Sequence, residues 1–308
     1  MNATVSETKA PKTGVGSQWK SRMLDLLVLS GVAGLGDEGI AHVWQKVRQE
    51  GSVLTEFASS GPDRLQAHYG LSASAAKYVS QHGDQLRSRA SDLLQRAQDF
   101  SIVILAPGDA DYPAGIDEFY NCESPLLYAR GNLNLLNSPT VAILNSAEPS
   151  SQSLTNTLGL ASRLAETGWT LLAGTENPAY NVVGLAGKRA ESNLIVVLHQ
   201  GLLTAINRNP HREPIPLARH EDENFDPKRA LLISPFRLDG RWQRGNGPRR
   251  DKLVVSLAKT VVGIEIKSGG QMDTLCHEAI RLQRRVFLCQ QGKRPAQAFA
   301  NDKLIDIK

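Results

Sequence analysis

Residues 247–288 combine basic side chains with a glycine-rich turn, which are the residue types that bind phosphate. Arg249, Arg250 and Lys252 supply the positive charge at the start of this segment, and an apolar run leads from them to the turn. A glycine-rich turn between a strand and a helix directs backbone N–H groups and the positive end of a helix dipole at one point. The sequence therefore predicts a phosphate site here, and its turn residues are Ser268, Gly269, Gly270 and Gln271. In the alternative, Arg250 and Lys252 cap the following helix or pair with Asp251, and the turn holds no ligand.

The loop before this segment is also basic. Between Arg237 and Lys252, six basic residues, Arg244 among them, stand against two acidic ones. A loop of this charge is typical of a contact with a polyanion, and a solvated surface loop is the alternative. Phe236 and Trp242 lie beside the charges. An exposed aromatic ring there would stack on an unpaired base, whereas a buried ring would only pack against its neighbours.

Two further turns carry groups that can donate hydrogen bonds to a phosphate or to a base edge. Asn145 and Ser146 follow the apolar run 141–144, and Gly174 and Thr175 end the next apolar run. Ligands of open α/β sheets bind beyond the carboxyl ends of the strands, which is where both turns are expected. We predict that these residues belong to the nucleic-acid site; turns without any ligand are the alternative.

Apolar strands alternate with helical segments along residues 100–308. This alternation predicts an α/β fold with a Rossmann-like, doubly wound, mostly parallel sheet. A long polar loop is expected from 204 to about 228 because this stretch is polar and carries Pro210, Pro214 and Pro216. The predicted strands cover residues 103–105, 141–144, 169–174, 194–198, 230–234, 261–265 and 285–288, and the main predicted helices cover 153–166 and 182–191.

The first third of the chain has a different character. Residues 1–17 are small and polar and are expected to be disordered. Residues 18–99 predict a small all-helical domain of the helix-hairpin-helix or SAM-like kind, with Gly34-Leu35-Gly36 as a turn between two helices. Such a turn can present N–H groups to a DNA phosphate. Asp37 and Glu38 follow it and would oppose a phosphate, which favours a packing turn.

These motifs together resemble the DNA-processing protein A (DprA, also called Smf) family. The family pattern is roughly Arg-Asn-Arg-Ile-Ile-Ala-Gly-Leu-Ser, then Val-Val-Glu-Ala, then Ser-Gly-Ser-Leu-x-Thr-Ala, then Gly-Arg-x-Val-Phe. The chain also contains an Asp-Tyr-Pro run, a Ser-Pro-Leu-Leu-Tyr-Ala-Arg-Gly-Asn run and a closing Asn-Asp-Lys-Leu-Ile run that match the family. In order along the chain, the matching runs are 111–113, 124–132, 250–258, 262–265, 268–274, 284–287 and 301–305.

The resemblance implies a non-catalytic protein that binds single-stranded DNA and hands it to a RecA-type recombinase during transformation. It also implies a homodimer or a subunit of a larger complex. The chain departs from the family at two turns. The family has Gly-Thr-Arg after its first strand, where this chain has Asn145-Ser146-Ala147, and the turn after Gly174 gains Glu176 and Pro178. Both changes remove phosphate contacts from the family's site.

These departures leave two other hypotheses open. In one, the pocket has been retuned to a free nucleotide or a signalling ligand, as in a sensor of the wider LOG/SLOG superfamily that serves antiphage defence or a mobile element. In the other, the protein is a scaffold subunit whose pocket is empty. Raised melting temperature with the preferred ligand would separate the first of these from DNA binding.

Several classes of function have no motif in this sequence. No P-loop, GxGxxG fingerprint, Ser-His-Asp signature or pair of catalytic carboxylates is present, so we expect neither catalysis nor a cofactor. The three cysteines lack metal-ligand spacing. No apolar run approaches the roughly 20 residues that span a bilayer, and the N-terminus lacks the apolar core of a signal peptide. We therefore expect a cytoplasmic protein with no membrane contact.

Overall fold

The structure is a computed structural model that describes residues 15–50, 54–121, 123–206 and 209–289. The chain divides after Gln95 into two compact units, one helical and one α/β. Most of the expected disordered tail lies outside the described residues, although the first helix begins within it, at Val15. The closing family-like run at 301–305 also lies outside the described residues.

The N-terminal unit is built from helices, as the sequence predicts. The turn around Gly34 joins the first two helices, and Gly34 adopts a φ of 78°, which favours glycine. α3 begins with Pro62 in its first turn and ends at Gly70 in the left-handed conformation, the usual signals for a helix start and stop. The elements are α1 (Val15–Gly31), α2 (Asp37–Gln49), a 3₁₀ helix η1 (Leu54–Ser59), α3 (Pro62–Tyr69) and α4 (Ala73–Asp99).

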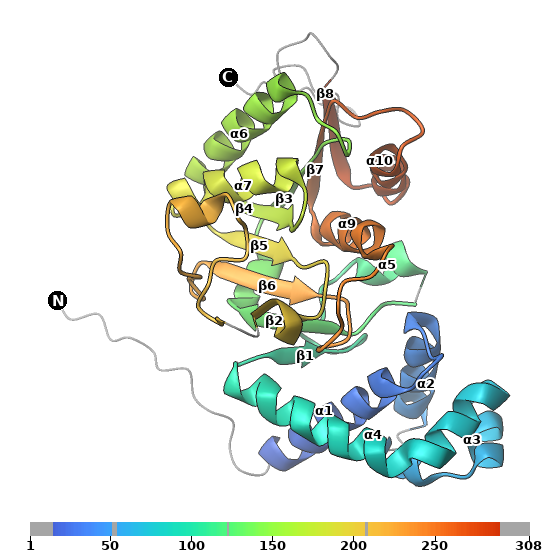
Figure 1. Cartoon of the computed structure of the whole chain (residues 1–308). Helices are drawn as coiled ribbons and strands as arrows, with labels where there is room; N and C mark the ends of the chain where they lie inside the picture. The colour runs from blue at the N-terminus through green and yellow to red at the C-terminus, as the bar shows by residue number, and fades with distance from the viewer. Residues whose placement is uncertain (1–14, 51–53, 122, 207–208, 290–308) are drawn as a thin grey trace. The chain divides into compact units, whose positions relative to one another are not determined.

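The C-terminal unit contains one eight-stranded sheet in the order β1-β2-β6-β5-β4-β3-β7-β8 (Figure 1). The β1–β2 and β2–β6 pairs are antiparallel, and every pair between β6 and β8 in the strand order is parallel. The prediction of a Rossmann-like, mostly parallel sheet is confirmed. The strands are β1 (Val103–Leu105), β2 (Leu127–Gly131), β3 (Thr140–Leu144), β4 (Thr170–Gly174), β5 (Leu194–Val197), β6 (Ala230–Ser234), β7 (Thr260–Ile264) and β8 (Arg285–Cys289).

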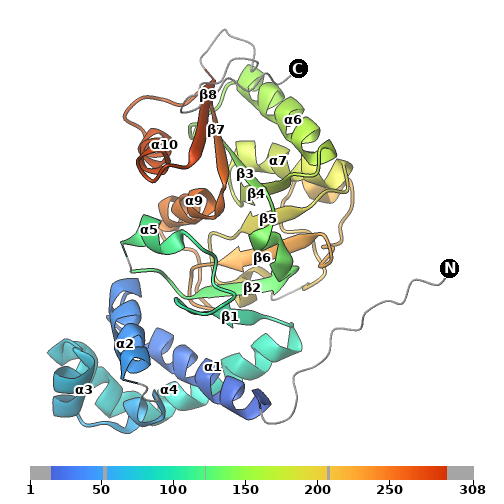
Figure 2. The same cartoon turned by 180° about the vertical axis from the view of Figure 1, so that it is seen from behind.

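Helices cover both faces of this sheet, as Figures 1 and 2 show from opposite sides. α6 and α7 pack on each other on one face, and α9 packs with α5 and α10 on the other. Every residue of β3, β4, β6 and β7 is buried, which is why these strands read as continuous apolar runs. The helices are α5 (Ile116–Tyr120), η2 (Leu133–Asn137), α6 (Ser151–Glu166), α7 (Pro178–Arg189), α8 (Leu202–Ile206), η3 (Ala218–His220), α9 (Asn246–Leu257) and α10 (Gln271–Arg281).

The strand order creates a switch point between β3 and β7. Strands β3 to β6 follow one another in one direction across the sheet, whereas β7 and β8 continue on the other side of β3. The register aligns Leu144 with Gly263, so both strands end at the same level. A crevice beyond the carboxyl ends of the strands at such a point is where ligands of doubly wound sheets bind.

Two segments differ from the sequence-based expectation. The expected loop from 204 to 228 contains the short helices α8 and η3. The helix expected at 182–191 begins earlier, because Pro178 occupies its first turn and the Asn177 side chain accepts a hydrogen bond from the Ala179 N–H at 2.8 Å. The departure from the family pattern at Pro178 is therefore the start of a helix that Asn177 caps.

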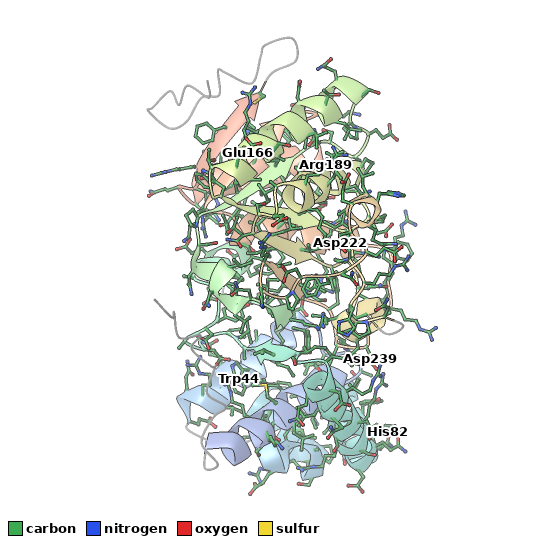
Figure 3. All side chains as sticks on the ribbon, turned by 90° about the vertical axis from the view of Figure 1, so that its left-hand side faces the viewer. Trp44, His82, Glu166, Arg189, Asp222 and Asp239 are labelled. Carbon is green, nitrogen blue, oxygen red and sulfur yellow. The ribbon has the colours of Figure 1, made fainter. Side chains whose placement is uncertain are left out.

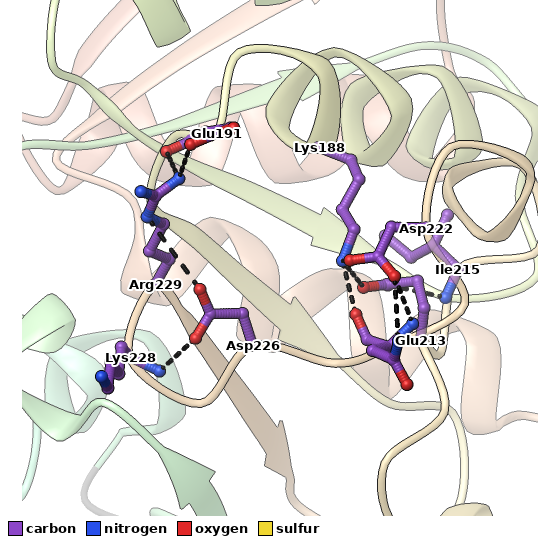
Figure 4. Close-up of polar contacts among 9 residues, drawn as sticks. Lys188, Glu191, Glu213, Ile215, Asp222, Asp226, Lys228 and Arg229 are labelled. Carbon is purple, nitrogen blue, oxygen red and sulfur yellow. Dashed lines mark hydrogen bonds and ion pairs between the residues drawn. The ribbon is translucent and has the colours of Figure 1, made fainter.

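Ion pairs fasten the segment between α8 and β6 to the end of α7 (Figure 4). Lys188 Nζ lies 3.1 Å from Asp222 Oδ2 and 3.6 Å from the buried carboxylate of Glu213. The next residue of α7, Arg189, pairs with Glu221 at 2.8 Å; Arg189 and Asp222 are labelled in Figure 3. These contacts lie at the amino ends of β5 and β6, opposite the edge at which the predicted site residues lie.

Candidate nucleic-acid interface

The predicted site residues lie at the carboxyl edge of the parallel strands. Asn145 and Ser146 follow β3, Thr175 follows β4, and the glycine turn follows β7. The register keeps these strand ends level, because Ala142 of β3 pairs with Leu172 of β4 and Leu144 of β3 pairs with Gly263 of β7. The structure therefore brings the turns to one edge, and the polar groups of each turn can be traced to their partners.

In the turn between β7 and α10, the backbone amides bind the protein's own oxygens. The N–H of Gly269 donates to Asp273 Oδ2 at 2.8 Å, and the N–H of Gly270 donates to the carbonyl of Lys267 at 3.1 Å. Asp273 lies in the first turn of α10, where a carboxylate is favoured by the helix dipole. This differs from the expectation that both amides point at a phosphate, because an internal carboxylate accepts one of them. Ser268 is exposed at this turn.

Arg250 is an interior residue, in contrast to the prediction of a surface phosphate ligand. It is 5% exposed, and its Nε and Nη2 donate to Asp251 Oδ1 at 2.9 and 2.8 Å. Its Nη1 donates to the carbonyl of Thr175, and its guanidinium lies 5.2 Å from the centre of the Tyr180 ring. The cause is helix geometry, since Arg250 lies three residues before the buried Leu253 on the same face of α9.

Asp251 is the centre of this buried network. Its Oδ1 also accepts a hydrogen bond from the Tyr180 hydroxyl at 3.0 Å, and its Oδ2 accepts one from Gln271 Nε2 at 2.9 Å. Burial raises the pKa of Asp251 above its usual value, and the adjacent charge of Arg250 opposes that rise. The network joins α7, α9 and α10, and the exposed Gln271 closes it at the surface by donating its side-chain amide to the buried carboxylate.

The turns after β3 and β4 are also bonded internally. Asn145 is buried and contacts the hydroxyls of Ser153 and Thr157 on α6, at 2.6 and 3.1 Å. The Ser146 hydroxyl accepts the N–H of Lys267 at 2.7 Å, which ties the β3 turn to the β7 turn. These two residues therefore hold α6 and β7 against the end of β3.

Gly174 and Thr175 support the buried arginine. A side chain at Gly174 would place its Cβ 2.7 Å from Arg250 Cδ, so the close approach requires glycine. The Thr175 hydroxyl lies 2.6 Å from His199 Nδ1, and burial lowers the pKa of that histidine. His199 is thus part of the packing at the carboxyl edge.

The switch-point crevice is a cavity of about 920 Å³ between the turns that follow β3 and β7. Its lining includes the carboxylates of Glu148, Glu265 and Asp273, with Lys267 as its cation. Glu265 also accepts hydrogen bonds from the N–H and the hydroxyl of Ser150, at 3.2 and 2.6 Å, so it holds the start of α6 beside the β7 turn. Three carboxylates around one lysine produce a field that opposes a phosphate group.

The loop between β6 and α9 presents the exposed positive charge of this edge. Trp242 is 59% exposed, whereas Phe236 is 6% exposed and packs in the core. Asp239, labelled in Figure 3, marks the loop in that view. Four arginine side chains of this segment are exposed: Arg237, Arg241, Arg244 and Arg249.

Two of the predicted cations near the start of α9 lie against aromatic rings. The Arg249 guanidinium lies 4.8 Å from the centre of the Phe236 ring, and the Lys252 ammonium lies 4.2 Å from the centre of the Tyr120 ring. Arg249 is exposed and Lys252 is half-buried. Both side chains reach the surface, unlike that of Arg250. Sequence reasoning counted Arg237 and Arg241 in the basic loop but did not select them as site residues.

The loop is anchored at both ends. The N–H groups of Gly201 and Leu203 donate to the carbonyls of Gly240 and Leu238, at 2.8 and 2.9 Å. At the other end, Asn246 Nδ2 donates to the carbonyl of His199 at 2.8 Å. Residues 241–245 lie between these anchors, and all five are exposed. The fold therefore holds a short, cationic, tryptophan-bearing run at the carboxyl edge.

Two of the three cysteines lie among the described residues. Cys276 is a buried free thiol whose pKa burial raises to about 12, and Cys289 is also free. Cys122 lies outside the described residues. Among the residues that the structure describes, no group of three His, Cys, Asp or Glu side chains is arranged to hold a metal ion. No helix in the same residues is long and apolar enough to cross a bilayer.

Comparisons with known proteins identify relatives of this fold. The DNA processing protein DprA of Streptococcus pneumoniae (strain ATCC BAA-255 / R6) is 25% identical over 194 residues, which is 63% of each chain. The match thus spans less than two thirds of that relative's length. The X-ray structure of DprA from the same species superposes with a TM-score of 0.66 at 18% identity, covering 90% of this chain and 89% of the other.

A further solved structure is that of DNA processing protein A from Helicobacter pylori, described for its single-stranded DNA binding mode. It has a TM-score of 0.45 at 20% identity and covers 63% of this chain and 84% of its own. The model of the family described as DNA recombination-mediator protein A matches residues 103–308. This match takes in the whole described sheet and the helices on both of its faces. The chain belongs to the DNA recombination-mediator protein A family.

Proposed function

We propose that this protein binds single-stranded DNA without catalysis and acts in DNA processing and recombination. The observation that carries the proposal is the exposed, anchored loop at the carboxyl edge, with Trp242 and the arginines around it. Cationic side chains attract the phosphate backbone regardless of sequence, and an exposed indole accepts an unpaired base. Membership of a recombination-mediator family supports the same function.

The proposal includes what the DNA is for. The protein delivers the bound strand to a RecA-type recombinase in the cytoplasm, and acts as a homodimer or as a subunit of a larger complex. Delivery is measured as the rate at which the recombinase assembles on an oligonucleotide already bound by this protein. The cations proposed to attract the strand are Arg244, Arg249 and Lys252 together with Arg237 and Arg241.

Fluorescence anisotropy with labelled oligonucleotides tests binding directly. We expect tighter binding to a single strand than to a duplex, because only unpaired bases can stack on the exposed indole. If the four exposed arginines each contact a phosphate, affinity for the single strand falls roughly 50-fold between 50 and 200 mM salt, from a slope of about 0.7 per phosphate. Arg241→Ala with Arg244→Ala lowers that slope by about 1.4.

A matched control keeps the same change of net charge. Arg189→Ala with Arg281→Ala removes two exposed arginines elsewhere, each paired with a glutamate, and leaves the slope unchanged. Equal salt slopes for the two double variants would show that the loop arginines do not contact the DNA. If free nucleotides raise the melting temperature and oligonucleotides do not, the protein is a nucleotide sensor. The negative charge of the carboxylates in the crevice disfavours that alternative.

A further inference from the structure

The exposed tryptophan of the β6–α9 loop stands between two exposed arginines. Trp242 is 59% exposed, and in the described residues the other large apolar side chain at the surface is Ile280, at 36%. A single exposed apolar residue needs no special explanation. The neighbours make the difference here, since Arg241 and Arg244 flank the indole. Within the described residues their guanidinium groups make no hydrogen bond or ion pair.

The backbone fixes where this run lies. The hydrogen bonds at Gly240 and Asn246 hold its two ends at the edge of the sheet. Gly245 adopts a φ of 98° where the loop turns into α9, a conformation that favours glycine. The buried Leu238 secures the loop to the core on its first side. A side chain presented from a segment held in this way loses little further entropy when it binds a ligand.

The rest of the carboxyl edge is poorly suited to a phosphate backbone. Arg250 donates its hydrogen bonds to Asp251 and to the carbonyl of Thr175, and the N–H of Gly269 donates to Asp273. The switch-point cavity adds further carboxylates. The loop is therefore where positive charge and an apolar ring lie together at this edge, in the part of the chain that the structure describes.

We propose that Trp242 stacks on one unpaired base of a DNA strand while Arg241 and Arg244 contact the flanking phosphates. This inference rests on the proposed function and places its single-strand contact in the loop instead of the switch-point crevice. Stacking uses the face that every base has, so the contact is independent of sequence and requires an unpaired base. The two arginines add charge without base recognition.

The test separates the base from the backbone. An oligonucleotide of thymidines is compared with an abasic strand of the same length, which keeps the phosphates and lacks the bases. Trp242→Ala weakens binding to the thymidine strand roughly 5- to 150-fold, the equivalent of about 1–3 kcal/mol, and leaves the abasic strand unaffected. Trp242→Phe restores most of the affinity. Gln243→Ala, an exposed neutral neighbour, is the matched control and changes neither.

Each outcome has a distinct meaning. If Trp242→Ala binds the thymidine strand as the unaltered protein does, stacking is overturned and DNA binding stands. If it weakens both strands equally, the ring shapes the loop and does not contact a base, which also overturns the inference. If the unaltered protein binds neither strand at 50 mM salt, the proposed function itself fails. Unchanged melting temperatures establish that the exposed-site variants remain folded.

Discussion

At the scale of single residues, charge and exposure separate sharply in this protein. Arg249 and Arg250 are neighbours in the sequence, yet Arg249 is exposed and Arg250 is 5% exposed. Neighbouring helix positions point in different directions, so one faces solvent and the other the core. The buried guanidinium neutralises the buried Asp251, and the pair is held by the Tyr180 hydroxyl and the Thr175 carbonyl. Its role is structural.

Replacement of Arg250 by alanine should therefore destabilise the fold. It leaves the Asp251 carboxylate buried without its charge partner, which costs about 3–5 kcal/mol of unfolding free energy. Denaturant unfolding followed by circular dichroism measures this loss. Arg249→Ala is the control, and it retains the stability of the unaltered protein while weakening DNA binding. An Arg250→Ala protein of unaltered stability that binds DNA weakly would show that the guanidinium acts at the surface.

The sequence contained part of this information. Arg250 precedes Leu253 and Val254 by three and four residues, which is the helical spacing of one face. Pairing of Arg250 with Asp251 is the alternative that the sequence offers, but the spacing does not show that both side chains are buried. Likewise, Phe236 and Trp242 read alike beside the basic loop, and only the anchoring of Gly240 and the packing around β6 bury one and expose the other.

At the scale of elements, the sequence predicts the parallel strands, but it does not predict that side chains of the protein accept the hydrogen bonds of the turn N–H groups. β3, β4 and β7 are buried on both faces, so their apolar runs are unmistakable. The three-residue β1 carries no signal of direction, and its antiparallel pairing with β2 emerges only in the sheet. The sequence predicts the turn at Gly269, but whether its N–H is open to a ligand depends on the position of the Asp273 side chain, which accepts that N–H in the structure.

The helical unit offers a test of a buried acid. Asp25 on α1 is 8% exposed, and burial raises its pKa to about 6, with the charge of Arg87 on α4 opposing the rise. A carboxyl whose pKa is higher in the folded state favours folding below its unfolded pKa of 3.8 and loses that contribution as pH rises towards 6. The loss is of the order of 1–3 kcal/mol.

Asp25→Asn removes this titration. We expect hydrogen exchange of α1 and α4 amides to slow at pH 7.5 in the variant, after correction for the intrinsic rate, and to change little at pH 4. Asp84→Asn on the exposed face of α4 is the control and should have no effect at either pH. Faster exchange in Asp25→Asn at pH 7.5 would mean that the ionised carboxylate stabilises the unit.

At the scale of the whole molecule, the chain has the fold of its family, and its own side chains bond most polar groups of the turns at the carboxyl edge. The family match covers residues 103–308, and the superposition on the pneumococcal protein supports the same fold. The switch-point crevice, the expected place for a ligand, is lined by carboxylates, while exposed cations gather on the β6–α9 loop. We infer that a strand of DNA follows the loop at this edge.

Photocrosslinking tests this account most directly. A single-stranded oligonucleotide carrying 5-iodouracil is bound, irradiated and digested, and the crosslinked peptides are identified by mass spectrometry. The account predicts that the crosslink falls on the peptide containing Trp242 and disappears in Trp242→Ala. Crosslinks confined to residues 145–148 and 265–271, with none on the loop, would place the bases in the switch-point crevice and contradict it.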